Sequence, residues 1–213
     1  MRSLLILLVT LAIIFSGCVE ERKRVVWDVD HEPVFPVSHY SKLISQFEAE
    51  VIEGGVEELE NSKAYILSGV TRNFTDEEVE EISKFVENGG KLVILIHIPP
   101  ANLKPLLERF GVEVSERPYE ITEIIAVPTE ESILTEGVNE IYMRGVFPVN
   151  GSLFVVKKDR TIVFGEAKGG VAKLTKFGKG EVLVFGDDAM FLNSYIGKAD
   201  NLKLAKNIAK WIN

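Results

Sequence analysis

Four side chains capable of acid–base chemistry or ligand binding follow segments that read as buried strands. They are Asp28, His31, His97 and Asp187. In open α/β sheets, ligands bind beyond the carboxyl ends of the strands, so strands that run in parallel would bring these residues to one rim. Carboxylates and imidazoles can ligate a metal ion or transfer protons. The sequence therefore predicts a candidate ligand site made of these four residues.

Each residue also has a purely structural interpretation. Asp28 can cap the turn after its strand, and Asp187 can cap a short helix that begins near Ala189, because aspartate is a favoured N-cap residue. His97 precedes Ile98-Pro99-Pro100 and can be a packed loop histidine. Spacing alone does not show that the side chains converge, so both interpretations stay open. The sequence assigns no cofactor and no metal ion to the chain.

Several known kinds of site are excluded. Neither of the common phosphate-loop patterns occurs, and the Gly-x-Ser-x-Gly pattern of many hydrolases is absent. Cys18 is the only cysteine, so the part of the chain after it has no cysteine nucleophile and no disulfide. The net charge of -8 argues against nucleic acid as a partner, since phosphates require a basic surface.

The N-terminus resembles a lipoprotein signal peptide spanning residues 1–17. Arg2 is followed by the apolar run Leu4–Phe15, and Ser16-Gly17 lie directly before Cys18. An uncleaved transmembrane helix is one alternative, but the run is shorter than the roughly 20 residues that a bilayer needs. A buried N-terminal helix is a second alternative, although a charged stretch, Glu20–Arg24, follows immediately. We expect a lipid on Cys18, a short tether at residues 18–24, and a domain at the extracytoplasmic face of the cell membrane. Stable anchoring of this kind takes two acyl chains.

Two tripeptides match the acceptor pattern for N-glycosylation. They begin at Asn73 (Asn73-Phe74-Thr75) and at Asn150 (Asn150-Gly151-Ser152). So short a pattern also arises by chance, so these asparagines are candidates for modification only. A single glutamine, Gln46, beside abundant glutamate, valine, isoleucine and lysine resembles the composition of thermophile proteins.

The remaining residues, 25–213, are suited in length to one domain. Thr75 and Glu78 form a capping box, an apolar stripe follows, and Gly89-Gly90 ends the helix. Further helices are expected at Tyr40–Glu50 and at Leu103–Phe110. A last helix, capped by Asp200, is expected to bury Leu202, Ala205, Ile208 and Ile212. Buried strands are expected at Val25–Asp28, Ala64–Leu67, Leu92–Ile96 and Val182–Phe185, with an edge strand at Val51-Ile52.

Short strands with turns dominate Val112–Phe185. Two hairpins are expected there, one pairing Leu153–Val156 with Thr161–Phe164 and one pairing Val171–Phe177 with Glu181–Phe185. Because strands alternate with helices in the first half, the predicted fold is a three-layer α/β sandwich, flavodoxin-like, with a mainly parallel sheet to which antiparallel strands are added.

These pieces resemble the class I glutamine-amidotransferase-like superfamily, in a branch of exported or membrane-attached proteins. The motifs that carry the resemblance are Asp28-x-x-His31, Phe74–Glu78 leading to Phe85–Gly90, Leu106–Gly111, Gly178–Asp187, and Asn201, Ala205, Asn207 and Trp211. True amidotransferases place a nucleophilic cysteine after a central strand. Here the corresponding strand leads into His97, so the covalent glutamine chemistry is ruled out. The resemblance implies an accessory domain of a transport or envelope complex.

The sequence thus favours a non-catalytic, membrane-anchored binding or scaffold module, with a membrane-protein complex as its expected partner. A hydrolase that uses Asp28, His31 and Asp187, with or without a metal ion, is the alternative. A small-solute receptor is disfavoured, because a single domain lacks the two lobes of hinge-closing receptors.

Overall fold

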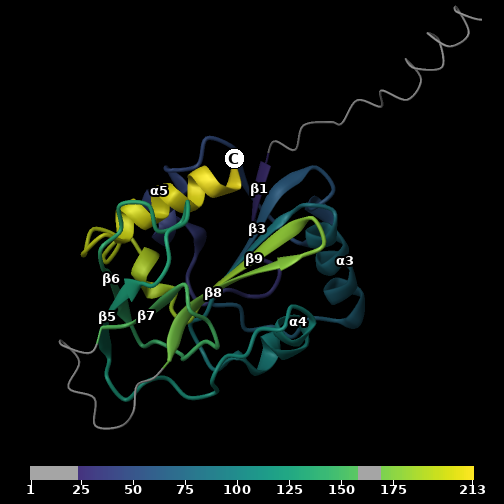
Figure 1. The fold of residues 1–213 in the computed structure, drawn as a ribbon. Helices are drawn as coiled ribbons and strands as arrows, with labels where there is room; N and C mark the ends of the chain where they lie inside the picture. Colours follow the sequence, from purple (N-terminus) through teal and green to yellow (C-terminus); the bar gives the residue numbers. More distant parts are fainter. Residues whose placement is uncertain (1–23, 158–168) are drawn as a thin grey trace, which may run out of the picture.

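The computed structural model describes residues 24–157 and 169–213. These residues build one nine-stranded sheet in the order β2-β1-β3-β4-β9-β8-β7-β5-β6 (Figure 1). The strands are β1 (Arg24–Asp28), β2 (Glu50–Gly54), β3 (Ser62–Ser68), β4 (Lys91–Leu95), β5 (Glu123–Pro128), β6 (Ile141–Arg144), β7 (Phe154–Val156), β8 (Gly170–Phe177) and β9 (Gly180–Phe185).

The helices that the structure describes are few and mostly short. The α-helices are α2 (Ser41–Ile44), α3 (Asp76–Glu87), α4 (Lys104–Arg109) and α5 (Asn201–Ile212). The 3-10 helices are η1 (Val37–Tyr40), η2 (Val56–Glu58), η3 (Pro100–Leu103) and η4 (Ala189–Phe191).

The sheet is mixed, and the predicted mainly parallel sheet is wrong. Strands β2, β1, β3, β4 and β9 pair in parallel. The other four pairings, β9–β8, β8–β7, β7–β5 and β5–β6, are antiparallel. The segment 112–177, expected to add antiparallel strands to the sheet, extends it, because β8 pairs with β9 on one side and with β7 on the other.

The layers also differ from the predicted three-layer, flavodoxin-like sandwich. Helices α3 and α4 pack in one hydrophobic cluster on one face, and α2 and α5 belong to a second cluster on the other (Figure 1). In β5 to β7 the buried residues other than Tyr142 belong to the α5 side, whereas the alternate residues Ile125, Val127 and Val155 are only half-buried. The antiparallel half is therefore covered by helix on one face only.

The prediction for α3 is confirmed. Thr75 accepts a hydrogen bond from the backbone N–H of Glu78, and the Glu78 carboxylate accepts one from the N–H of Thr75. The buried stripe includes Phe85, and Gly89 has a φ of 100°, which suits glycine at a helix end. The β8–β9 hairpin and the edge position of β2 are confirmed as well.

Other local expectations need correction. The helix expected to reach Glu50 ends at Ile44, because β2 begins at Glu50 and pairs with β1. In α5, Leu202 is 38% exposed and Leu204 is buried in its place. The Asp200 side chain does not cap α5 but accepts the N–H of Asn139 at 2.8 Å. The expected strand Thr161–Phe164 lies outside the described residues, as do the signal peptide and Cys18.

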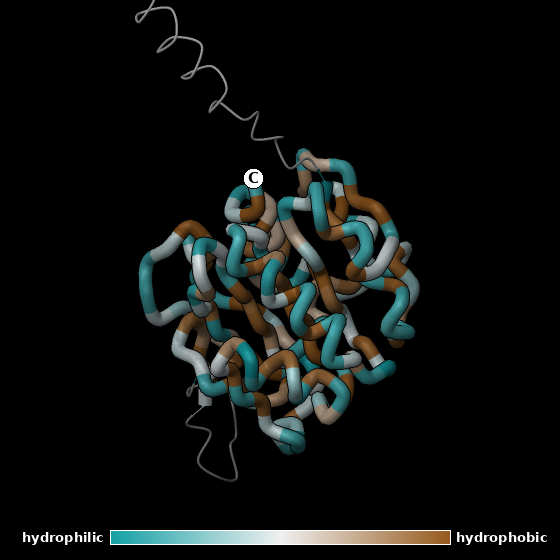
Figure 2. The backbone as a smooth tube through the Cα atoms, turned by 90° about the vertical axis from the view of Figure 1, so that its right-hand side faces the viewer, coloured by the Kyte–Doolittle hydropathy of each residue, from teal (hydrophilic) through white to brown (hydrophobic). Residues whose placement is uncertain are grey.

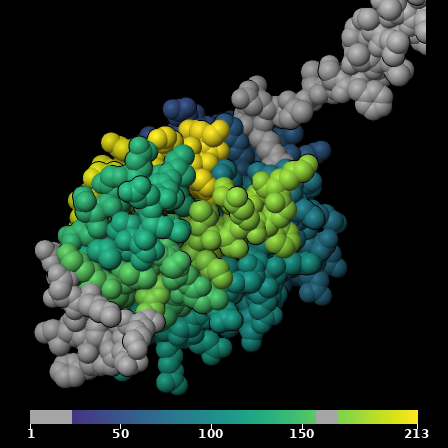
Figure 3. Space-filling view, viewed as in Figure 1, coloured from purple at the N-terminus to yellow at the C-terminus, as the bar shows by residue number. Residues whose placement is uncertain are grey.

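The two halves of the sheet are held together from one side by α5. Figure 2 shows hydrophobic stretches along the inner strands and hydrophilic ones at the turns, and Figure 3 shows the C-terminal helix against the segments around β6. The end of α5 lies near the start of β1 (Figure 1). Between residues 24 and 213, apart from the gap at 158–168, no helix has both the length and the apolar character to cross a bilayer.

Candidate functional site

Asp28 and His31 meet in the first of two clusters at the carboxyl ends of the parallel strands. Both side chains are fully buried, and His31 Nδ1 lies 2.7 Å from Asp28 Oδ1. Asp28 Oδ2 accepts the backbone N–H of His31 at 3.2 Å, and the Tyr65 hydroxyl donates to Asp28 Oδ1 at 2.5 Å. Asp28 thus fastens its own loop to the end of β1 and to β3.

The other nitrogen of His31 is also occupied. Arg72 Nη2 lies 3.0 Å from His31 Nε2. A guanidinium can only donate, so Nε2 is the acceptor and the proton resides on Nδ1, facing Asp28. Phe74 stacks on the imidazole with ring centroids 3.8 Å apart. His31 therefore has no nitrogen left for a metal ion or a substrate.

Arg72 is in turn fixed by Glu78, the capping residue of α3. Its Nη2 donates to Glu78 Oε1 at 2.6 Å, and its Nε donates to the backbone oxygen of Asp30 at 2.9 Å. Burial alone would raise the pKa of Glu78, but the bonds from Arg72 and from the Thr75 N–H outweigh it and lower that pKa to about 2. Burial, with Asp28 next to it, raises the pKa of Tyr65 far above its usual range.

The loops after β1 and β3 close the crevice between them. The chain leaves β1 towards β2 and leaves β3 in the opposite direction towards β4, so this crevice is the switch point at which open α/β sheets bind ligands. The N–H groups of Thr71 and Arg72 donate to the oxygen of His31 at 2.8 and 3.1 Å. The N–H of Val34 donates to the oxygen of Gly69 at 2.9 Å. Main-chain bonds therefore occupy the switch point.

A second cluster forms around Asp188, which follows β9. Its carboxylate is fully buried; Oδ1 lies 2.7 Å from Nδ1 of His97 and Oδ2 accepts the Tyr40 hydroxyl at 2.7 Å. Burial and the two aspartates at 187 and 188 raise the pKa of Tyr40 well above its usual range. The buried Ser68 hydroxyl lies beside Tyr40 without reaching hydrogen-bond geometry to any described residue.

His97 is the part of this cluster that reaches solvent. Its side chain is 29% exposed, and the edge of the ring faces Phe35 at a centroid distance of 4.9 Å. The hydrogen bond to Asp188 raises the pKa of His97 more than burial lowers it. Among the described residues nothing is hydrogen-bonded to Nε2. An imidazole oriented by a carboxylate, with its other nitrogen open, can act as a general base or bind a polar ligand.

Asp187 forms hydrogen bonds with different partners from those of Asp188. Its carboxylate accepts the N–H groups of Ala189 and Met190, the first two residues of η4, at 2.8 and 3.2 Å, from one position before the N-cap residue Asp188. It also accepts the N–H of Arg144 at 2.8 Å, at the end of β6. Burial raises its pKa to about 7, against the effect of these three donors. Within the described residues, no hydrogen bond links Asp187 to Asp28 or His31.

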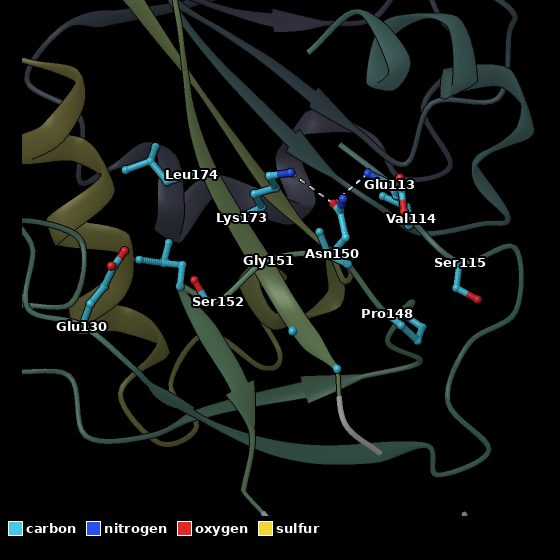
Figure 4. A pocket seen from close by; sticks show the side chains of 14 residues that line it. Glu113, Val114, Ser115, Glu130, Pro148, Asn150, Gly151, Ser152, Lys173 and Leu174 are labelled. Atoms are coloured by element: carbon cyan, nitrogen blue, oxygen red, sulfur yellow. Dashed lines mark hydrogen bonds between the residues drawn. The ribbon is translucent and has the colours of Figure 1, made fainter. Parts of the chain in front are cut away.

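The remaining candidate residues lie apart from these clusters. Asn73 and Asn150 are both exposed. Asn150 lines a groove of about 750 Å³ that crosses β8, shown in Figure 4, on a part of the sheet distant in sequence from His97. Over residues 24–157 and 169–213, no three His, Cys, Asp or Glu side chains are grouped so that they could hold a metal ion.

The sequence interpretation missed Asp188, Tyr40 and Arg72. Asp188 stands beside Asp187, and nothing in the pair indicates which carboxylate turns towards β4 and which towards β6. Tyr40 is separated from Asp188 by 148 positions. The sequence did offer one signal for Arg72. It lies just before the capping box, six positions from Glu78, with which it pairs.

Several solved structures of other proteins superimpose on this fold. The mmIFT52 N-terminal domain superimposes with a TM-score of 0.65 at 17% identity, over 89% of this chain and 97% of that domain. A cytoplasmic protein from Salmonella typhimurium LT2 gives 0.63 at 15% identity, over 89% and 99%. A β-galactosidase from Bacillus circulans gives 0.59 at 14% identity, over 92% of this chain and 31% of the enzyme. At these identities the likeness is one of fold alone.

Sequence comparison gives the family. No curated protein matches the chain. The family described as "Domain of unknown function (DUF4350)" matches residues 50–209, from β2 to the last turn of α5. The match thus includes β3, β4 and β9 and both aspartates that follow β9. The chain belongs to the DUF4350 family.

Proposed function

We propose that this protein is a non-catalytic binding or scaffold module, anchored by a lipid on Cys18 at the extracytoplasmic face of the membrane, where it serves a transport or envelope complex. The observation that carries the non-catalytic part is the closed crevice between β1 and β3. The loops that would frame a substrate there bond to each other instead.

Opening this crevice would be costly. Besides three main-chain bonds, the Thr71 hydroxyl donates to the oxygen of Glu32 at 2.8 Å and Arg72 Nε donates to that of Asp30 at 2.9 Å. A typical hydrogen bond contributes about 0.5–1.5 kcal/mol net. A substrate entering the switch point would have to replace all of them, so this rim is better suited to presenting a fixed surface than to enclosing a small molecule.

The direction of β1 is consistent with a rim that presents a fixed surface to a partner. Arg24, the last residue of the proposed tether, begins β1, and Asp28 ends the strand at the rim. The rim and the tether therefore lie at opposite ends of the strand. If the tether is attached to a membrane, the rim with Phe35 and His97 points away from it and is accessible to a partner.

The amidotransferase-like relationship is part of the proposal. β4 lies inside the sheet between β3 and β9, as the nucleophile-bearing strand does in that superfamily, and the chain leads from it into His97. The Nδ1 atom of His97 lies 2.7 Å from Asp188 Oδ1. This chain would then share the fold of the superfamily but would have lost its covalent glutamine chemistry.

The anchoring is tested by replacing Cys18 with serine in the full-length protein. Wild-type protein should be recovered in the membrane fraction, and mass spectrometry should find its N-terminus at a lipid-modified Cys18. The Cys18→Ser variant should lack the lipid and either stay uncleaved or leave the membrane. Ser16→Ala keeps a small residue before the cysteine and is the matched control. Wild-type protein with an intact, unmodified N-terminus would contradict the anchoring.

Partner binding is tested by crosslinking the anchored protein in native membranes. Phe35→Ser and His97→Gln alter the rim, whereas Lys206→Ala alters an exposed position on α5. Crosslinked partners should be lost in the rim variants and kept in the α5 variant. A crosslinking pattern that no rim variant changes would contradict the use of this surface.

A hydrolase is the second candidate, favoured by one observation. The His97–Asp188 pair has the orientation of a general base and its carboxylate, with 2.7 Å between Nδ1 and Oδ1. Asp28 and His31 do not suit this role, since both nitrogens of His31 are engaged. Ester and peptide substrates incubated with wild-type protein, His97→Gln and His39→Gln separate the candidates. Turnover that disappears only in His97→Gln would replace the non-catalytic proposal.

A further inference from the structure

The nine-stranded sheet has one covered edge and one open edge. Beyond β6, Ile141 forms an antiparallel bridge with Ala199. Within residues 24–157 and 169–213, β2 pairs with β1 and with no other strand. Apart from the bonds of the β1–β2 ladder, no main-chain hydrogen bond reaches residues 50–53 from elsewhere in the described chain. The outer side of β2 is therefore open to another chain.

The groups that point outward from β2 follow from its pairing with β1. The oxygen of Gly54 accepts the N–H of Val29, the residue after β1, at 3.2 Å. Residues that bond to the neighbouring strand alternate along a parallel strand, so Ile52 faces β1 as Gly54 does. The N–H and C=O groups of Val51 and Glu53 point the other way. They form a row of two donors and two acceptors to which an added strand can bond.

The side chains of this edge are of two kinds. Glu50 and Glu53 are exposed, whereas Val51 and Ile52 are half-buried. Because successive side chains of a strand point to opposite faces, each face carries one glutamate and one aliphatic side chain. The residues of an added strand would lie on the same faces as the residues opposite them. The complementary pattern is basic, apolar, apolar, basic, and it is the same in either direction.

The charge around the edge selects the occupant. Between Lys42 and Lys63 there is no lysine, arginine or histidine, and there are six glutamates, at positions 48, 50, 53, 57, 58 and 60. Of these, Glu58 forms an ion pair with Arg24 at 3.4 Å. A second copy paired in register would set glutamate against glutamate, and like charges opposite each other destabilise paired strands. A basic strand would gain attractive pairs instead.

We propose that the β2 edge binds an extended basic segment of a partner protein, which adds to the sheet as a new edge strand. Its lysine or arginine side chains lie opposite Glu50 and Glu53, and its aliphatic side chains lie opposite Val51 and Ile52. The main-chain bonds supply affinity, and the side-chain pattern supplies specificity. This interaction depends neither on the lipid anchor nor on the partner-binding rim, so its failure would leave the proposed function unchanged.

Binding is tested by fluorescence anisotropy with the full-length purified protein and the labelled peptide Thr-Lys-Val-Val-Lys-Thr-amide. The peptide in which glutamate replaces both lysines should bind at least about 10-fold more weakly, because two attractive pairs become repulsive. Hydrogen exchange of segment 48–55 should slow when the lysine peptide is present. Equal binding of the two peptides, or binding of neither, would overturn the proposal.

Methylated peptides separate strand addition from attraction of charge alone. In the proposed register the N–H of the second valine faces β2 whichever way the peptide runs, and the N–H of the first valine faces solvent. N-methylation of the second valine should therefore abolish binding, and N-methylation of the first should be tolerated. Equal effects of the two methyl groups would contradict pairing at the edge.

The occupant is checked by sedimentation of the wild-type protein alone. It should show no dimer that Glu53→Pro dissociates. Such a dimer would replace the basic partner with a second copy of this chain.

Variants of the protein locate the site. Glu53→Pro removes an outward N–H but no bond to β1, which edge strands tolerate. It should bind the lysine peptide about 3- to 10-fold more weakly than Glu53→Ala, which keeps the N–H. Glu50→Lys combined with Glu53→Lys should reverse the preference between the two peptides. Glu130→Lys combined with Glu131→Lys, exposed after β5, should leave that preference unchanged.

Urea denaturation confirms that each variant is folded before its binding is compared. A folded proline variant that binds as the alanine variant does would contradict the assigned role of the Glu53 N–H. A folded variant with lysine at 50 and 53 that still prefers the lysine peptide would place binding elsewhere and overturn the proposal.

Discussion

The side chain of Asn201 pairs with both backbone groups of Tyr142. Its Oδ1 accepts the Tyr142 N–H at 2.9 Å, and its Nδ2 donates to the Tyr142 oxygen at 2.8 Å. Tyr142 lies in β6, the edge strand of the antiparallel half. One amide from the first turn of α5 thus acts as a neighbouring strand would, and it covers an edge that could otherwise pair with another chain.

Replacing Asn201 with leucine should therefore destabilise the fold. The buried N–H and C=O of Tyr142 would lose their partner, at about 1–3 kcal/mol for each group left unpaired. Urea denaturation measures the change. Lys206→Ala, exposed on the same helix, should shift the free energy of unfolding by less than about 0.5 kcal/mol. An Asn201→Leu variant as stable as Lys206→Ala would show that the amide does not support the edge.

Phe85 and Gly90 should be energetically coupled. A Cβ on Gly90 would lie 2.4 Å from the Phe85 ring, so Gly90→Ala forces the ring out of place. Phe85→Ala alone should cost about 3–5 kcal/mol, because the ring is buried in the core against β4. The double variant should cost clearly less than the two single changes added together.

A double-mutant cycle by chemical denaturation measures that coupling. Gly197→Ala is the control, since no atom lies within 4 Å of its added Cβ. If the changes in the free energy of unfolding for the Phe85 and Gly90 variants were additive, the Phe85 ring would not lie against Gly90.

Glu78 should stabilise the fold down to acidic pH. Its pKa in the folded state is about 2, against 4.5 ordinarily. The folded pKa is depressed, so the stabilisation is fully present above pH 4.5 and is lost as the pH falls through about 2. Glu78→Gln should remove this part of the acid dependence in urea titrations between these pH values. Glu77→Gln, exposed in the same turn, should leave the profile as in wild type.

His97 should titrate above the ordinary histidine value of 6.5, because the hydrogen bond to Asp188 favours the imidazolium. The folded pKa is raised, so its stabilising contribution is present below pH 6.5 and is lost as the pH rises through the folded value. NMR of the imidazole signals measures the shift, with His39→Gln to assign them. Asp188→Asn should bring the pKa of His97 down; no change would show that the pair does not set it.

The sequence by itself determined the elements whose signals lie within a few residues. The capping box of Thr75 and Glu78, the apolar stripe through Phe85 and the glycine stop at Gly89 define α3 within one short segment, because capping bonds and helical periodicity are local. The buried strands and the β8–β9 hairpin were predictable for the same reason. The absence of a cysteine after Cys18 is likewise a property of the sequence alone.

Only the tertiary structure decided how these elements pair and which polar side chains meet. Leu202 and Leu204 both fit an apolar helix face, and the position of α5 over β6 selects Leu204 for burial. Asp187 and Asp188 are chemically identical neighbours, but the first turns to the N–H of Arg144 and the second to His97, from which it is separated by 91 positions. Such contacts depend on strand order, and strand order depends on β8 pairing with β7 as well as with β9. Long-range backbone pairing leaves no local pattern in the sequence, so the mixed sheet and the separation of the two clusters could be seen only in the folded chain.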